Sequence, residues 1–302
     1  MPRVWQPLAK TAAARPWRLL YLNGAASVAA VAVGGTGTKE EYTAAFGLLA
    51  EAENIGVMLC DSEELTVQQA LRDSVAAASG ARRERIAVAG SSGETVSELV
   101  ERAKGLNSER LVLVGGEGLD SGGRSLGGPV TAAAVAGAIA AGADPAVPLN
   151  GAELRGMYGL EKAYSDDEID LLVRGGVTPL ESTAGIVSVV RGITSRTTTG
   201  DAADTTWREL TTILIVDDVI PQIRSALRRK FTRAKNTAQT RSAIRSQVIV
   251  ELENKRRAEI IDSFGEVQVR PAEEDATVCE VEFSFAVAHG LNQIYLTAHI
   301  TV

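Results

Sequence analysis

The sequence contains few of the residues that most often carry out chemistry in proteins. Among 302 residues there are two cysteines, two histidines and three methionines, and aromatic residues make up 4%. Neither His289 nor His299 has an evident nucleophile partner, and there is no Gly-x-Ser-x-Gly turn. Cysteine, histidine and carboxylate residues show no spacing typical of metal ligands. We therefore expect no enzymatic activity and no cofactor.

The two cysteines do not indicate a disulfide. Cys60 ends the apolar run 55–60, and Cys279 lies on the apolar face of a predicted strand, so both are expected to be small buried hydrophobic residues. A chain of this length can bury a core without a disulfide, and it is long enough for two domains. A reducing compartment is the default expectation.

Long uninterrupted apolar runs are also absent. No run approaches the roughly 18 residues that a transmembrane helix needs, so stable membrane insertion is not expected. Four basic residues precede the apolar stretch 19–33 and resemble a targeting signal, but polar residues interrupt that stretch. We favour an arm or a strand within residues 1–25 over a cleaved signal. The apolar residues of this possible arm are Trp17, Leu19, Leu20, Tyr21 and Leu22.

Charge is distributed unevenly along the chain. The net charge is -7, but residues 217–257 contain eleven Lys and Arg against four Asp and Glu, so the rest of the chain carries -14. A chain divided in this way can contact an acidic surface with one face and stay soluble through the other. Nucleic acid and an acidic protein are both candidate partners.

The basic residues recur at helical spacing. Arg224 and Arg228 are four residues apart and Lys235 follows Arg228 by seven, which predicts one shared helical face, with Arg229 and Arg233 further round. Beside this face lies an apolar stripe that is expected to seat the helix on its own domain, formed by Val219, Ile220, Ile223, Leu227 and Phe231. The basic face is either simply solvated or docks onto an acidic surface. The lack of interleaved aromatic residues argues against single-stranded nucleic acid as that surface.

Residues 26–196 alternate apolar runs with helical patterns, which is typical of an α/β domain. Short apolar runs between amphipathic helices predict a parallel sheet covered on both faces, as in a doubly wound fold. We expect strands at 28–33, 55–60, 86–89, 111–114 and 186–190, and helices at 39–53, 66–78, 95–106, 130–141 and 166–174.

One turn in this domain matches part of a dinucleotide-binding motif. The turn Gly34–Thr38 contains three glycines between a predicted strand and a predicted helix, and Asp61 ends the next strand. The position of the motif's last glycine is Glu40, whose carboxylate would repel a pyrophosphate. A Rossmann-like nucleotide-dependent enzyme with its site here is the alternative function, and a plain strand-to-helix turn is favoured.

Residues 197–302 predict a separate α+β domain after the polar loop 194–206. We expect a strand at 211–216, helices at 217–235 and 241–263, and three strands after them. The stretch 279–287 alternates apolar and polar residues without a break. So does the stretch 293–302, with Ile294, Leu296, Ala298, Ile300 and Val302 on one face and Tyr295, Thr297, His299 and Thr301 on the other. A strand at a free end needs a partner for its main-chain groups, and we expect a neighbouring subunit to supply it.

Short motifs in a fixed order run through most of the chain. The clearest occupy residues 191–196, 207–210, 216–219, 223–227, 235–236, 241–245 and 260–262, and fainter ones occupy 121–123, 136–137 and 150–156. In their order and spacing these motifs resemble the tail sheath proteins of contractile phage tails and related particles such as tailocins.

The resemblance implies a structural protein. It implies an α/β domain of subtilisin-like topology without the catalytic triad, followed by a C-terminal α+β domain that rests on an inner tube. It further implies that Arg224, Arg228, Arg229, Arg233 and Lys235 face the tube and that subunits exchange terminal strands. Such subunits polymerise helically around the tube and contract to drive it through a cell envelope.

The resemblance also implies partners and a location. The expected partners are further copies of the chain, the tube protein, and baseplate and tail terminator proteins, with no nucleic acid. The expected location is a virion tail or a tailocin particle that is assembled in the host cytoplasm.

Overall fold

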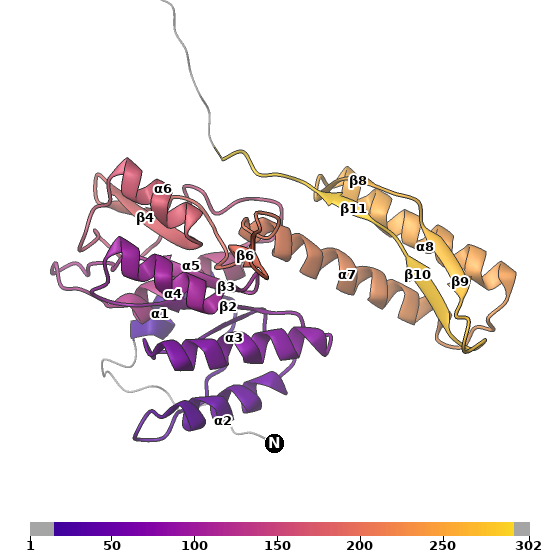
Figure 1. Cartoon of the computed structure of the whole chain (residues 1–302), viewed down its shortest axis with the longest axis horizontal. Coiled ribbons are helices and arrows are strands. Elements are labelled where there is room, and N and C mark those ends of the chain that lie inside the picture. Colours follow the sequence, from indigo (N-terminus) through magenta and orange to yellow (C-terminus); the bar gives the residue numbers. More distant parts are fainter. Residues whose placement is uncertain (1–14, 293–302) are drawn as a thin grey trace, which may run out of the picture. The chain divides into compact units, whose positions relative to one another are not determined.

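The computed structural model describes residues 15–292, so the predicted strand at 293–302 lies outside the described residues (Figure 1). The described chain forms two compact units. The first contains the residues up to Ala143 and those from Pro148 to Leu210, and the second contains residues 144–147 and the chain from Thr211 onward. The prediction placed the boundary between residues 196 and 197, whereas the contacts divide the chain after Leu210.

The first unit is built on a five-stranded sheet whose strands follow chain order. The strands are β1 (Val57–Leu59), β2 (Ile86–Gly90), β3 (Leu111–Gly115), β4 (Val177–Thr183) and β5 (Ile186–Val189). The first four are parallel, and β5 returns antiparallel to β4. A doubly wound sheet reverses its strand order at a switch point. This sheet does not, so the mixed α/β class is confirmed and the doubly wound description is not.

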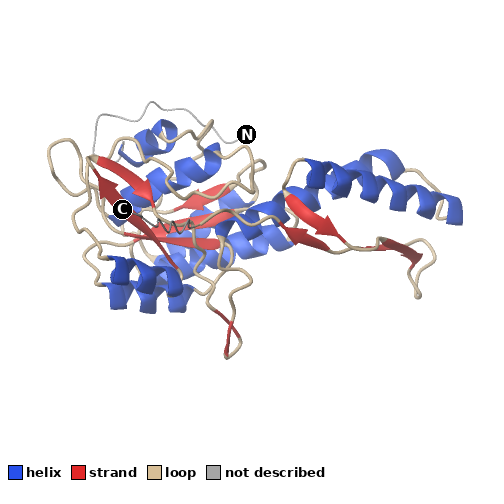
Figure 2. Cartoon of the chain, turned by 90° about the horizontal axis from the view of Figure 1, so that it is seen from above, coloured by secondary structure: helices blue, strands red, loops and turns tan. Residues whose placement is uncertain are grey.

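Helices cover both faces of this sheet (Figure 2). One layer contains α2 (Lys39–Ala50), α3 (Leu65–Gly80), α4 (Val96–Leu106) and α6 (Asp166–Arg174), in which each helix packs on the next. On β1, β2 and β3 lies α5 (Gly128–Ala141), and α1 (Arg15–Leu22) packs on α5. Capping boxes begin α2, α4 and α6, because a threonine or serine and a glutamate three residues later satisfy each other's main-chain N–H groups.

The described part of the predicted arm is helical, because residues 15–22 form α1 and not a strand. Residues 1–14 lie outside the described residues. Leu19 and Leu20 are each only 5% exposed. The Asn23 side chain donates to the Leu19 carbonyl (2.8 Å) and to the Arg155 carbonyl (3.1 Å), and the Arg155 N–H donates back to Asn23 Oδ1 (2.8 Å). At Gly137 of α5 an added Cβ would lie 2.6 Å from the Leu20 carbonyl oxygen, so the two helices need glycine there.

Two further features of the first unit differ from the prediction. Residues 28–33 form neither a strand nor a helix, and β4 was not predicted. Pro179 explains why β4 was missed, since proline within an apolar run argues against a central strand. Here Pro179 still pairs with Gly115, and its carbonyl accepts a hydrogen bond from the Val190 N–H (3.0 Å).

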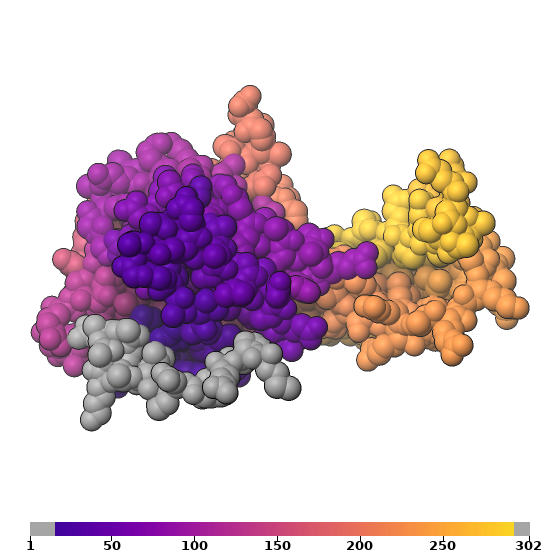
Figure 3. Space-filling model, turned by 90° about the horizontal axis from the view of Figure 1, so that it is seen from below, coloured from indigo at the N-terminus to yellow at the C-terminus, as the bar shows by residue number. Residues whose placement is uncertain are grey.

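A short hairpin, β6 (Thr198–Thr199) with β7 (Ala202–Ala203), stands out from the surface of the first unit (Figure 3). Asn107, in left-handed conformation (φ 33°) at the end of α4, holds its base. The Asn107 side chain accepts hydrogen bonds from the N–H groups of Thr197 (3.0 Å) and Thr198 (3.2 Å) and donates to the Thr198 carbonyl (3.1 Å).

We expect Asn107→Gly to lower the free energy of unfolding by about 2 kcal/mol, because the side-chain hydrogen bonds are lost while the left-handed conformation is retained. Asn107→Ala should lose about 1 kcal/mol more, because alanine is strained in that conformation. Denaturant unfolding of both variants separates the two effects. Equal losses would show that the backbone conformation contributes nothing.

The second unit pairs two long helices with an irregular hairpin. The helices are α7 (Leu210–Phe231) and α8 (Ala238–Arg257), and the strands are β8 (Ile261–Phe264), β9 (Gln268–Pro271), β10 (Cys279–Glu282) and β11 (Phe285–Val287). Antiparallel pairs join β8 to β11 and β9 to β10, and α8 packs on β8 and β9. The core contains Ile215, Val219, Ile223, Val248, Leu252, Ile260, Ile261 and Val267.

Two predictions for the second unit are wrong. Residues 211–216, predicted as a strand, are the first turns of α7. The second helix was predicted to reach residue 263, but it ends at Arg257, and Glu259 follows in a left-handed conformation (φ 58°). The predicted alternation over 279–287 is confirmed, because Val281, Phe283 and Phe285 are half-buried and the residues between them are exposed.

Cys60 is buried, as predicted, whereas Cys279 is only half-buried. Cys60 and Cys279 are both free, and burial raises the pKa of the Cys60 thiol to about 11, which makes it a poor nucleophile. Within residues 15–292, no helix is both long and apolar enough to span a bilayer.

Candidate interaction surfaces

Exposed basic residues at the end of α7 form the first candidate surface. Arg228 and Arg229 lie in the last turn of the helix, and Arg233 and Lys235 follow in the loop to α8; all four are exposed. We call these four residues the basic end of α7. Arg224 differs, because it is half-buried and has an interaction partner of its own.

The predicted shared helical face is only partly right. Helix α7 ends at Phe231, so helical spacing does not place Arg233 or Lys235. Their loop is positioned instead by Asn236, whose side chain donates to the carbonyls of Ala276 (2.7 Å) and Val278 (3.1 Å). The sequence reasoning missed Asn236. The sequence did offer a sign of this role, because Asn236 directly precedes Thr237, the N-cap of α8, and asparagine favours turns.

The apolar stripe of α7 seats the helix in the second unit. Val219 and Ile223 are buried, and Leu227 packs half-buried against the same cluster, as predicted. Lys255 of α8 forms an ion pair with Asp218, and both side chains are largely buried. The basic end is therefore carried by a firmly packed helix.

Several other basic residues of this unit are neutralised locally, and the basic end of α7 is not. Arg256 and Arg257 both pair with Glu253, and the hydrogen bond from Arg256 lowers the pKa of Glu253 to about 2. No ion pair joins Arg228, Arg229, Arg233 or Lys235 to another residue in 15–292. Basic residues in the last turn of a helix stabilise its C-terminus, which accounts for Arg228 and Arg229. It does not account for Arg233 and Lys235, which lie in the loop.

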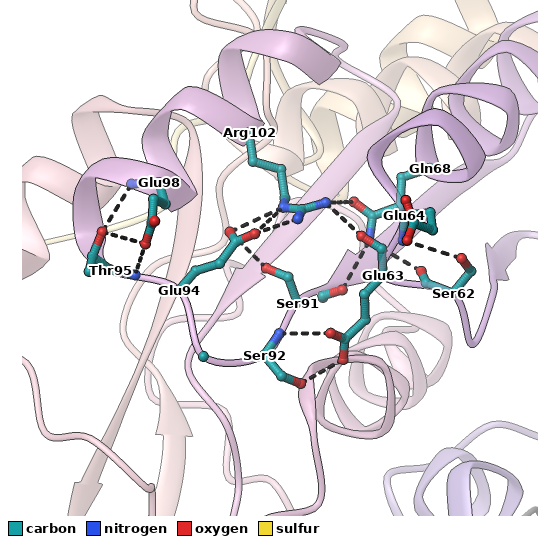
Figure 4. Close-up of polar contacts among 12 residues, drawn as sticks. Ser62, Glu63, Glu64, Gln68, Ser91, Ser92, Glu94, Thr95, Glu98 and Arg102 are labelled. Carbon is teal, nitrogen blue, oxygen red and sulfur yellow. Dashed lines mark hydrogen bonds and ion pairs between the residues drawn. The ribbon is translucent and has the colours of Figure 1, made fainter.

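The carboxyl edge of the first unit's sheet carries a polar network rather than an open site (Figure 4). Ser92 Oγ donates to Glu63 Oε1 (2.6 Å), and Ser91 Oγ donates to Glu94 Oε2 (3.1 Å). Arg102 forms an ion pair with Glu94, with the two side chains 16% and 18% exposed, and donates to the Glu63 carbonyl (2.8 Å). Both serine hydroxyls donate to carboxylates, and the hydrogen bond from Ser92 ties two neighbouring loops together.

Further bonds join the surrounding loops to this network. Glu117 accepts from the Gly93 N–H (2.6 Å) and from Ser125 Oγ (2.7 Å). The Gln68 side chain donates to the Gly90 carbonyl (2.9 Å), and Arg102 donates to Gln68 Oε1 (3.2 Å). The network holds three loops together. No group of His, Cys, Asp and Glu in the described chain could hold a metal ion.

The Gly34–Thr38 turn lacks the context that a nucleotide site needs. No strand precedes it, and Thr38 forms a capping box with Glu41. Asp61 accepts a hydrogen bond from the Tyr42 hydroxyl (2.6 Å), and burial together with this bond raises the pKa of Tyr42. The Rossmann-like alternative is therefore not supported.

The hairpin of the second unit offers a further candidate surface. Each of its ladders has two strands, and no third strand pairs with either among the described residues. A two-stranded sheet is only marginally stable by itself and leaves main-chain groups available at its edges. Each ladder therefore has edges that no described strand occupies.

Comparisons with known proteins cover both units. A family model described as the phage tail sheath protein central domain matches residues 35–195, and one described as the phage tail sheath C-terminal domain matches residues 202–301. The tail sheath protein of Bacillus phage SP01 is 30% identical over 252 residues, which cover 82% of this chain and 43% of that protein. The chain thus spans less than half the length of the curated relatives it matches.

Solved structures share the fold. The anti-feeding prophage helical sheath in its contracted state has a TM-score of 0.75 at 15% identity, covering 97% of this chain and 83% of that one. The sheath tail protein of Desulfitobacterium hafniense has a TM-score of 0.65 at 14% identity, covering 84% of this chain and 61% of that one.

Proposed function

Because the chain belongs to the phage tail sheath protein family, we propose that it is the repeating subunit of a contractile sheath, which polymerises helically around an inner tube and contracts to drive that tube through a cell envelope. The observation that carries this proposal is the fold, which matches a helical sheath over nearly the whole chain. The proposed location is a virion tail or a tailocin particle assembled in the host cytoplasm.

We propose that the basic end of α7 contacts the tube, with Arg224 beside it. Its four cationic side chains make no ion pair within the described chain. Arg228 and Arg229 lie on a packed helix, and Asn236 anchors the loop that carries the other two. An acidic tube surface supplies the missing counter-charges. Each exposed pair contributes only roughly 0.2 to 1 kcal/mol, so the body can release the tube during contraction.

We propose that residues 293–302 are donated to a neighbouring subunit as a strand. The unbroken alternation of Ile294 to Val302 and the two-stranded ladders of the second unit support this. We expect this link to persist while the subunits rotate, because the donated strand keeps its hydrogen bonds to the neighbouring subunit. The ends of the polymer are proposed to contact baseplate and terminator proteins.

We propose that the first unit is a structural body and has no enzymatic role. This is supported by the serine–carboxylate network at its carboxyl edge, which joins loops that would line an active site in an α/β enzyme.

Electron microscopy of the purified chain, alone and with its tube protein, tests the proposed function. We expect rings or helical tubes of regular diameter. A chain that stays monomeric under both conditions contradicts the proposal.

A further inference from the structure

The second unit separates its charges between its helices and its strands. Residues 217–257, which include α8 and the C-terminal part of α7, contain eleven basic residues against four acidic ones. Residues 259–282, which include β8, β9 and β10, contain eight acidic residues against one basic residue, Arg270. The two parts of this unit therefore carry net charges of +7 and −7. A surface that carries both signs in separate patches can be complementary to a second copy of itself.

The acidic part includes one ordered loop, the connection between β9 and β10. Three consecutive exposed carboxylates lie there, and we call them the acidic loop: Glu273, Glu274 and Asp275. The Ala272 N–H donates to the Val278 carbonyl (3.1 Å), which closes the connection. Asp275 accepts hydrogen bonds from the Thr277 hydroxyl (2.6 Å) and N–H (2.7 Å), which hold the pKa of its carboxyl below the usual range. The loop is thus both ordered and charged.

The acidic loop lies beside the basic end of α7 but is not paired with it. Asn236, directly after Lys235, donates to the carbonyls of Ala276 and Val278, so the two loops are joined. Within residues 15–292, however, no ion pair joins the acidic loop to a basic residue or the basic end to an acidic one. Two patches of opposite charge are therefore fixed next to each other, and neither neutralises the other.

Two residues of the basic end lack a role within the subunit. Arg228 and Arg229 stabilise the C-terminus of α7, whereas Arg233 and Lys235 lie beyond the helix and are exposed. Their counter-charges must come from another molecule. The acidic loop of a second copy has the matching charge, and it is held on a loop of similar exposure.

We propose that the acidic loop of one copy pairs with Arg233 and Lys235 of a second copy in the polymer. The inference rests on the proposed function, which surrounds each subunit with identical neighbours, and it gives these two residues a partner besides the tube. Because different patches of the two copies meet, the contact is heterologous and can continue from copy to copy, as a helical polymer requires. It is separate from the donation of residues 293–302.

Two double charge reversals test this pairing in polymer formed without the tube. The first is Arg233→Glu with Lys235→Glu, and the second is Glu273→Lys with Glu274→Lys. Each alone should lower the yield of sedimentable polymer roughly tenfold, because the contact then brings like charges together. An equimolar mixture should return to within about twofold of wild type, because the new carboxylates of one variant meet the new amines of the other. Mixing restores a contact between copies and cannot restore one within a subunit.

Each outcome has a defined meaning. A normal polymer from either variant alone, or a mixture that stays as poor as its components, overturns the inference. The control Lys39→Glu with Arg82→Glu makes the same charge change as the first variant and should polymerise normally; an equal loss there shows an effect of net charge and also overturns it. Wild-type chain that forms no polymer overturns the proposed function itself. All variants should keep the wild-type melting temperature, because the altered side chains make no ion pair in the described subunit.

Crosslinking of the wild-type chain tests the contact without any substitution. A carbodiimide joins an amine to a carboxylate that touches it, and the polymer is prepared from a mixture of nitrogen-15-labelled and unlabelled copies. Mass spectrometry should find Lys235 joined to Glu273 or Glu274 in peptides with one labelled and one unlabelled half. The absence of this crosslink, or crosslinks whose two halves always carry the same label, overturns the pairing between copies.

Discussion

Removal of residues 293–302 should leave a folded subunit that no longer forms sheaths. A donated strand makes about five ladder bonds at roughly 1 kcal/mol net each and buries several apolar side chains at about 1.5 to 3 kcal/mol apiece. The link is therefore on the order of 10 kcal/mol, and its loss should bring assembly below detection. Sedimentation and negative-stain microscopy measure the polymer, and circular dichroism measures the fold.

Two triple variants provide the matched control for this truncation. Replacing Ile294, Leu296 and Ile300 by serine should abolish assembly, because these residues share the apolar face of the predicted strand. Replacing Tyr295, Thr297 and His299 by serine on the other face should be far less damaging. Normal sheaths from the truncated chain would end the strand-donation proposal.

Reversing the charge of Arg228 and Arg229 to glutamate should block assembly on the tube and leave folding intact. Both side chains are exposed and make no ion pair within the described chain, so their loss costs the subunit little. On an acidic surface the change replaces attraction with repulsion at two sites of every subunit, and the effect is multiplied along the polymer. Co-sedimentation with tubes measures it, and raising the salt concentration should weaken wild-type binding in the same direction.

The control for this double variant carries the same charge change on the first unit. Lys39 and Arg82 are exposed and make no ion pair with a described residue, so Lys39→Glu with Arg82→Glu alters the net charge equally. This control should assemble normally. If the two double variants assemble on the tube equally well, the basic end of α7 is an ordinary solvated surface.

The sequence predicted the elements whose signals are local. Helix α6 matches its predicted bounds, because the serine cap, the acidic first turn and the final arginine all agree. Strands β2 and β3 were found because both are continuous apolar runs buried along their whole length. The apolar stripe of α7 was found from its spacing.

The elements that were missed depend on distant contacts. Residues 211–216 are rich in β-branched residues and were predicted to be a strand, but burial in the core outweighs that preference and they form the first turns of α7. Pro16 is the second residue of helix α1. Proline suits the first turn of a helix, but here it suggested an irregular arm. Its docking on α5 depends on the close approach at Gly137, which no local pattern reveals.

The candidate surfaces were only partly predicted, because they too depend on contacts between residues that are distant in the sequence. Charge and spacing identified Arg228 and Arg229, whereas the half-buried position of Arg224 and the anchoring of the loop by Asn236 depend on tertiary contacts. Residues 28–33 show the opposite case. A local apolar pattern predicted a strand there, and the structure gives the segment neither strand nor helix.

The most direct test of this account is a cryo-electron microscopy map of the assembled polymer in which residues 293–302 can be traced. The account predicts that this segment leaves its own subunit and pairs with a strand of the second unit of a neighbour. Pairing of the segment with its own subunit's strands, with no borrowed strand beside them, would contradict it.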